Sequence, residues 1–234
     1  MHLQKLTSLS LALFLFLVFS CKKDVTPSPY ASASVYLSFE NNDAKMVGSN
    51  YNNVIFGNDR KGNPNAAADF NGLNSYVQIP FDEKYRKDQY SISLWASSRL
   101  LPRLGEAMWL LTMGQKFDQF IILTNDYFGN NGWGAGGYDD PVTTISSVYD
   151  GVVPKSETWN HVVLTRNGGI IKLYVNGKMA VSKDFGVKKP FYGTAPVIYI
   201  GARGTVQPFN GKIDDFALFD KVLTDAEVAD IFNY

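Results

Sequence analysis

The stretch ETWNHVVLTRNGGIIKLYVNGKMA, residues 157–180, decides the fold because it reads as consecutive strands joined by tight turns. HVVLT (161–165) and IIKLYV (170–175) are short apolar runs of the length typical of strands. The tripeptide Asn167-Gly168-Gly169 between them is a strong hairpin signal, and Asn176-Gly177 closes the next hairpin. The stretch therefore predicts neighbouring antiparallel strands.

The same pattern extends over the chain from residue 35 onward, with turn residues about every ten positions. In YSISLWAS, for example, Tyr90, Ile92 and Leu94 alternate with serines and a tryptophan. A single convincing helix is predicted at the C-terminus, where Thr224 and Glu227 form a capping box in LTDAEVADIF. We expect an all-β, one-domain sandwich with a short C-terminal helix.

Composition limits the classes of partner. The chain has 234 residues, of which 45% are hydrophobic, so it can bury a core and is not disordered. Its 22 basic and 22 acidic residues give a formal net charge of zero, and no basic block stands out. Nucleic acid and anionic membrane surfaces are therefore poor candidate partners.

The N-terminus has the layout of an export signal. Residues 1–20 form an apolar run with a short polar start, which predicts a signal peptide. Val18-Phe19-Ser20-Cys21 resembles a bacterial lipobox, so we expect Cys21 to be lipidated and residues 21–34 to be a flexible tether before a domain at 35–234. The alternatives are a plain signal peptide or a single spanning anchor, although the run is shorter than the roughly 20 apolar residues that a span needs. The expected location is an exported, membrane-anchored lipoprotein at the periplasmic face or the cell surface.

Several segments together resemble a known family. FNGLNSYVQIP (70–80), the Trp159-x-His161-Val162 motif and Gly211-x-Ile213-Asp214 are similar to the laminin-G-like, concanavalin A-like jelly-roll domains. Asn176 stands where this family commonly has an acidic residue. The resemblance implies two curved antiparallel sheets packed face to face, with a ligand often carried on the concave sheet.

Asp214 is the most informative carboxylate. Strict alternation puts it on the same face as Phe216 and Leu218, where a carboxylate needs a partner. The resemblance implies a bound calcium ion near the first strand, so we expect a structural Ca²⁺ held by Asp214 with Asn42 or Glu40. The alternative is that Asp214 accepts backbone N–H bonds without any metal.

GWGAGG, residues 132–137, matches G-x-G-x-x-G by letters. The run is followed by YDDP and a β-branched segment, whereas a dinucleotide site needs a helix there, so nucleotide binding is rejected. We expect the return strand of a hairpin with FIILTND (120–126), with Gly132, Gly134 and Gly136 on one face. That face is either the floor of a sugar-binding groove or part of an irregular edge strand.

The groove hypothesis names five ligand-binding residues. Trp133 and Tyr138 would be aromatic platforms, and Asp139, Asp140 and Asn131 would bind hydroxyl groups. In the alternative interpretation, Trp133 packs in the core.

Catalysis is not expected. His161 is the only histidine after the signal and is best interpreted as a hydrogen-bonded strand residue. No glutamate of the chain begins the E-x-D-x-x-E pattern that glucanases with this fold carry. We expect a non-catalytic, lectin-like module that binds a glycan or polysaccharide and meets the membrane only through its lipid anchor. The alternatives are a glycoside hydrolase with an unrecognised acid pair and a structural or adhesive lipoprotein that binds protein.

Overall fold

The two Asn-Gly turns produce the predicted run of strands. β11 (Trp159–Asn167), β12 (Ile170–Val175) and β13 (Lys178–Asp184) are antiparallel neighbours, with Leu164 opposite Leu173. Asn176 occupies the second turn with a φ of 51°, and its side-chain oxygen accepts a hydrogen bond from the His161 amide at 2.9 Å. An amide oxygen thus serves as the acceptor at the position where the family commonly has a carboxylate.

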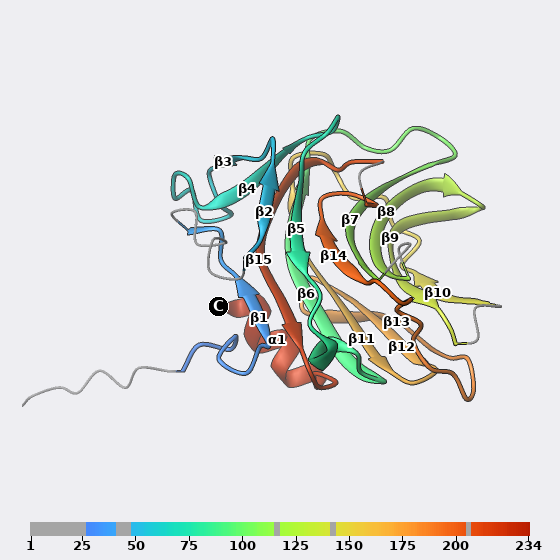
Figure 1. Ribbon diagram of the computed structural model, residues 1–234. Coiled ribbons are helices and arrows are strands. Elements are labelled where there is room, and N and C mark those ends of the chain that lie inside the picture. Colours follow the sequence, from blue (N-terminus) through green and yellow to red (C-terminus); the bar gives the residue numbers. More distant parts are fainter. Residues whose placement is uncertain (1–26, 41–47, 115–117, 141–143, 205–206) are drawn as a thin grey trace, which may run out of the picture.

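The computed structural model describes residues 27–40, 48–114, 118–140, 144–204 and 207–234. Within these ranges, two antiparallel sheets pack face to face and one α-helix lies against the first of them, as predicted (Figure 1). The predicted signal peptide and Cys21 lie outside the described residues. In the part of the chain that is described, no helix has the length and apolar character needed to span a bilayer.

Eight strands make up the first sheet and seven the second, counted over the described residues. The first sheet runs in the order β13, β12, β11, β6 (Gln89–Ser98), β15 (Asn210–Phe219), β4 (Ala67–Asn71) and β3 (Ile55–Gly57), and β1 (Val35–Leu37) also pairs with β15. The second sheet runs in the order β10 (Ile145–Tyr149), β9 (Asn130–Tyr138), β8 (Gln119–Tyr127), β7 (Glu106–Gly114), β14 (Val197–Ile200), β5 (Tyr76–Pro80) and β2 (Asn50–Asn52).

The main core lies between the sheets and follows the alternation read from the sequence. Ile92 and Leu94 of β6 pack in one cluster with Ile121 and Leu123 of β8. The serines between Ile92 and its neighbours on β6 point to the other face of the first sheet, because successive side chains of a strand alternate. The alternation therefore fixes which face of β6 meets the second sheet.

A second core covers the outer face of the first sheet. Helix α1 (Asp225–Asn233) buries Val228 and Ile231 there, beside Phe219 of β15. Its N-terminus has the predicted capping box, in which the Glu227 amide donates to Thr224 Oγ1 at 3.2 Å and Glu227 Oε2 accepts from the Thr224 amide at 2.8 Å.

The packed domain begins earlier than residue 35, so the expected boundary is corrected. Tyr30, placed in the tether by the sequence, is only 3% exposed and belongs to the second core. Its ring stacks on Tyr36 at 4.3 Å between centroids and meets the edge of Tyr234 at 6.0 Å. The burial of Tyr30 could not be predicted from the sequence, because a single aromatic side chain in a Ser- and Pro-rich segment gives no periodic pattern.

We predict that Tyr30→Ala lowers the free energy of unfolding by about 3 kcal/mol, because it leaves a cavity under the N-terminal segment. Urea denaturation monitored by tryptophan fluorescence measures the change. Ser32→Ala, at an exposed position three residues before β1 begins, is the control and should have no effect. Equal urea midpoints for Tyr30→Ala and the wild type would show that the domain starts at residue 35 after all.

Candidate functional site

The glycine-rich run GWGAGG lies in β9, which is the return strand of a hairpin with β8, as predicted. β9 also pairs with β10, so a strand and not a helix follows the glycines. Trp133 and Ala135 point into the main core, where Trp133 is 1% exposed. β9 is therefore an interior strand of the second sheet, flanked on both sides.

Close neighbours explain two of the glycines. A Cβ at Gly134 would stand 2.5 Å from a ring carbon of Tyr149, so the missing side chain makes room for that ring. A Cβ at Gly137 would overlap with the Asp118 carbonyl oxygen and the Gln119 side-chain oxygen. These two glycines thus allow neighbouring strands to pack closely, and protein atoms occupy the space that a side chain would take.

Asp139 is a partner of a buried arginine. Arg166 of β11 is fully buried, and its guanidinium donates to Asp139 Oδ1 in an ion pair and to Gln119 Oε1 at 2.7 Å. The other Asp139 oxygen accepts hydrogen bonds from Ser146 Oγ at 2.7 Å and Thr144 Oγ1 at 3.1 Å. Both carboxylate oxygens are therefore committed inside the protein.

The five predicted ligand-binding residues do not form one site, and this corrects the groove hypothesis. Trp133 and Asp139 are each 1% exposed, so neither can contact a ligand from solvent. Asn131 lies at the start of β9, and its side-chain oxygen accepts from the Asp126 amide at 2.9 Å. Tyr138 and Asp140 lie at the opposite end of β9, about 23 Å away by strand rise. The alternative interpretation, with Trp133 in the core, is the one that the structure supports.

Asp214 is buried on the outer face of the first sheet, contrary to the prediction that it shares a face with Phe216 and Leu218. A β-bulge between Asp214 and Ala217 shifts the register against β6, and Asp215 has a φ of 47°. Phe216 and Leu218 therefore face the main core while Asp214 lies on the other face, opposite Trp95. Alternation failed here because one extra residue was inserted, and no local sequence signal marks it.

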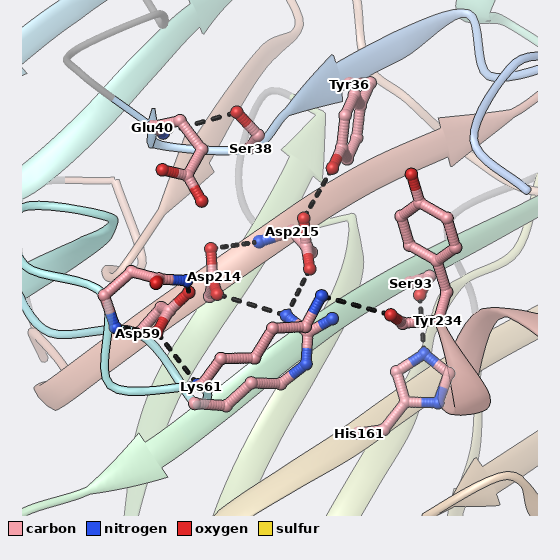
Figure 2. A network of polar contacts seen from close by, with 12 residues as sticks. Tyr36, Ser38, Glu40, Asp59, Lys61, Ser93, His161, Asp214, Asp215 and Tyr234 are labelled. Atoms are coloured by element: carbon pink, nitrogen blue, oxygen red, sulfur yellow. Dashed lines mark hydrogen bonds and ion pairs between the residues drawn. The ribbon is translucent and has the colours of Figure 1, made fainter. Parts of the chain in front are cut away.

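Arg60 is the cationic partner of Asp214 and Asp215, which together form what we call the corner (both aspartates are labelled in Figure 2). Its Nη1 lies 3.3 Å from Asp214 Oδ2 and forms an ion pair with Asp215 Oδ2. Burial and the neighbouring Asp215 carboxylate raise the pKa of Asp214, while Arg60 opposes that shift.

Of the predicted calcium ligands, the structure describes Asp214 and Glu40. Glu40 is exposed, and its amide donates to Ser38 Oγ at 3.2 Å. Asn42 lies outside the described residues. Among the residues that are described, no group of three or more His, Cys, Asp and Glu side chains could hold a metal ion. The calcium site therefore stays a prediction.

His161 is a buried strand residue, as interpreted from the sequence. It is fully buried, with Nε2 at 2.8 Å from Ser93 Oγ (Figure 2). Its ring packs against Trp95 and Phe232, which stack on each other with their centroids 5.5 Å apart. Burial lowers its pKa to about 3, so the imidazole is neutral near pH 7. Its side chain therefore does not reach solvent.

At one end of the sandwich the surface is hollowed, and the sequence did not predict this groove. Two hollows of about 360 and 370 Å³ share Asn210 in their linings, and we call the pair the end groove. The first hollow is lined by Gly72, Leu100, Leu101, Arg103, Glu106, Ala107, Met108, Gln207, Pro208 and Asn210, and the second by Asn53, Ile55, Asp69, Asn71, Arg99 and Asn210. These residues lie where β4, β6 and β3 meet the beginnings of β7 and β15.

Arg99 fixes the middle of the end groove. Its guanidinium donates to Asn210 Oδ1 and to Asp69 Oδ1, each at 2.6 Å. Asn210 pairs with Asn71 in the β15–β4 ladder, and Gly72 leaves space for the Asn210 side chain. The signal in the sequence was the repeated tripeptide Phe-Asn-Gly at 70–72 and 209–211, whose two asparagines become neighbours.

The wall of the first hollow carries groups suited to polar ligands. Arg103 and Glu106 are exposed, and within the described part of the chain neither side chain has an ion pair. Leu100 is 57% exposed and adds an apolar wall beside them. The hollow thus combines a cation, a carboxylate, amides and aliphatic surface, which is the mixture that concave ligand sites use.

Two antiparallel sheets packed face to face with a short C-terminal helix define the class of concanavalin A-like jelly-roll sandwiches. A family model described as the concanavalin A-like lectin/glucanases superfamily matches residues 70–229, and the chain belongs to this superfamily. No curated protein sequence matches the chain.

Solved structures agree on the fold. Domain 4 of AbnA, a GH43 extracellular arabinanase from Geobacillus stearothermophilus in complex with arabinotriose, is 21% identical with a TM-score of 0.67, over 86% of this chain and 97% of that one. The botulinum neurotoxin serotype D ligand-binding domain in complex with N-acetylneuraminic acid is 16% identical with a TM-score of 0.63, over 86% of this chain and 50% of that one. The serotype G binding domain has a TM-score of 0.64 at 16% identity, again over 86% and 50%.

We predict that Gly137→Ala destabilises the protein by about 1–3 kcal/mol, because the added methyl group overlaps with atoms that hold the Arg166 network. Chemical denaturation measures the effect. Gly57→Ala is the matched control, since its Cβ would meet the flexible end of Lys212 at 3.1 Å and Asp69 Oδ2 at an ordinary contact distance of 3.6 Å. Similar losses for the two variants would contradict the packing role assigned to the glycine strand.

Proposed function

We propose that this protein is a cell-envelope lipoprotein, lipidated at Cys21, whose domain is a non-catalytic carbohydrate-binding module. Its ligand is a glycan or polysaccharide that lies in the end groove. The observation that carries the proposal is the end groove itself. One hollow holds the Arg103 guanidinium, the Glu106 carboxylate and the aliphatic wall of Leu100, and Asn210 joins it to the second hollow, which Asn71 lines.

The chemistry of the groove supports a sugar ligand. Hydroxyl groups both donate and accept, so they need amides, carboxylates and guanidinium groups close together, as Asn210, Glu106 and Arg103 are. Leu100 supplies apolar surface for the C–H face of a sugar ring. Among the solved structures that contain this fold, domain 4 of the arabinanase is in complex with arabinotriose, and the neurotoxin domain, of which this chain covers half, is in complex with N-acetylneuraminic acid.

The position of the groove supports an anchored module. The chain enters the sandwich at β1, where Val35 pairs with Leu218, and the groove lies at Asn210, at the other end of β15. These two points are about 25 Å apart along the strand. In Figure 1 the N-terminal segment enters at the lower left, near α1, while the loop from β6 to β7 lies at the top. A lipid at Cys21 would leave the groove directed away from the bilayer.

The carboxylates of the groove support binding without hydrolysis. Glycoside hydrolysis needs two carboxyl groups facing one bond. Asp69 is held by Arg99 at 2.6 Å, which leaves Glu106 as the carboxylate of the groove lining without an ion pair among the described residues. The hydrolase alternative predicts release of reducing ends from a bound polysaccharide, whereas our proposal predicts none.

A glycan array containing arabinan oligosaccharides, sialylated glycans and bacterial polysaccharides tests the proposal, followed by calorimetry on the strongest hit. We expect Arg103→Ala to weaken binding about 10- to 100-fold, because hydrogen bonds from a charged group contribute about 1.5–3 kcal/mol.

Asp140→Ala is the matched control, because Asp140 is an exposed charged residue at the opposite end of the sandwich. It should bind like the wild type. Binding lost in Asp140→Ala but kept in Arg103→Ala would place the ligand at the wrong end for this proposal, and an array without any hit would favour the protein-binding alternative.

A further inference from the structure

The corner formed by Asp214 and Asp215 has an unusual arrangement for a strand. Consecutive residues of a strand point to opposite faces, yet the bulge and the positive φ of Asp215 turn both carboxylates toward Arg60. Asp214 is 2% and Asp215 7% exposed. Two buried carboxylates side by side repel each other and require a positive charge between them.

A rigid turn delivers this charge. Asp59 Oδ1 accepts the amides of Lys61 at 2.8 Å and of Asn63 at 2.7 Å, and Asn63 Nδ2 donates to Asp59 Oδ2 at 2.8 Å. The turn holds Arg60 so that its guanidinium carbon lies 4.6 Å from the Trp95 ring centroid. Arg60 is thus positioned by its own loop on one side and by an aromatic face on the other.

Each carboxylate oxygen at the corner has a donor from the protein. Asp214 Oδ1 accepts the Asp215 amide at 2.8 Å, and Asp214 Oδ2 lies 3.3 Å from Arg60 Nη1. Asp215 Oδ1 accepts a hydrogen bond from the Tyr36 hydroxyl at 2.5 Å, and Asp215 Oδ2 forms an ion pair with Arg60 (Figure 2). A calcium ion would need several of these oxygens and would stand against the guanidinium. The donor set does not fit a metal ion while Arg60 is in place.

We propose that Arg60 is a built-in substitute for a divalent cation at this corner, fastening the bulged β15 and the N-terminal segment through Asp214, Asp215 and Tyr36. The wild-type corner is therefore independent of calcium. Without the guanidinium, the Asp214 and Asp215 carboxylates are left buried with no positive partner, and a hard divalent cation from solution is the charge that replaces it. The inference concerns stability and does not depend on the glycan site.

The test compares the wild type with Arg60→Ala and Arg60→Gln in chelator and in millimolar calcium. We expect the Tm of the wild type to be the same in both buffers. The variants should melt lower in chelator, and calcium should raise their Tm by about 3 °C or more, because the ion binds only the folded corner.

Terbium supplies a second readout that does not rely on stability. Trp95 lies against the guanidinium, so a terbium ion in its place would emit on tryptophan excitation. We expect this emission from the Arg60 variants and none from the wild type. Arg86→Ala is the matched control, because Arg86 also lies over an aromatic ring, that of Tyr192 at 5.6 Å, but pairs with the single exposed Glu83. It should gain neither emission nor calcium dependence.

Three outcomes would overturn the proposal. Calcium stabilisation or terbium emission in the wild type would mean that a metal binds beside Arg60. Arg60 variants that fold but respond to neither ion would mean that the corner cannot hold a cation. If both variants fail to fold in chelator and are not recovered by refolding in calcium, the corner is likewise no cation site.

Discussion

Burial of the Arg166 guanidinium inside the sandwich is the constraint on which the rest of the structure depends. A charged group between two sheets is costly unless ion pairs and hydrogen bonds surround it. Asp139 and Gln119 of the second sheet, together with the Gly168 carbonyl oxygen at 2.9 Å from Nε, meet that need. Tyr90 Oη adds a 2.7 Å hydrogen bond to the same Gln119 oxygen. This network fixes how the two sheets meet at one end of the sandwich.

The network also makes the two ends of the sandwich different. It takes the Asp139 carboxylate into the interior, and the glycines of β9 let the neighbouring strands approach closely enough to complete it. At the other end the sheets leave the end groove, where Arg99 rather than a closed network organises the surface. The N-terminal segment joins at the closed end, with Tyr30 packed on the second core. One end is thus closed by the network and the N-terminal segment, and the other end is open.

Local patterns predicted the architecture because they depend on neighbours in the chain. The Asn-Gly turns, the alternation in β6 and the Thr224–Glu227 capping box all appear as expected. The site residues could not be predicted in the same way, because their roles depend on partners far along the chain. Asp139 was expected at the surface, yet its partner Arg166 lies on the other sheet, and Arg60 reaches Asp214 from 154 residues away. A single bulged residue was enough to move Asp214 to the other face of β15.

The most direct test of the central claim, that a glycan binds in the end groove, is a backbone amide NMR titration with the oligosaccharide selected by the array. The account predicts chemical-shift changes centred on the amides of Asn71, Arg103, Glu106 and Asn210, with those of Tyr138 and Asp140 unchanged. Shifts confined to Tyr138 and Asp140, or no saturable shifts in the groove, would contradict it.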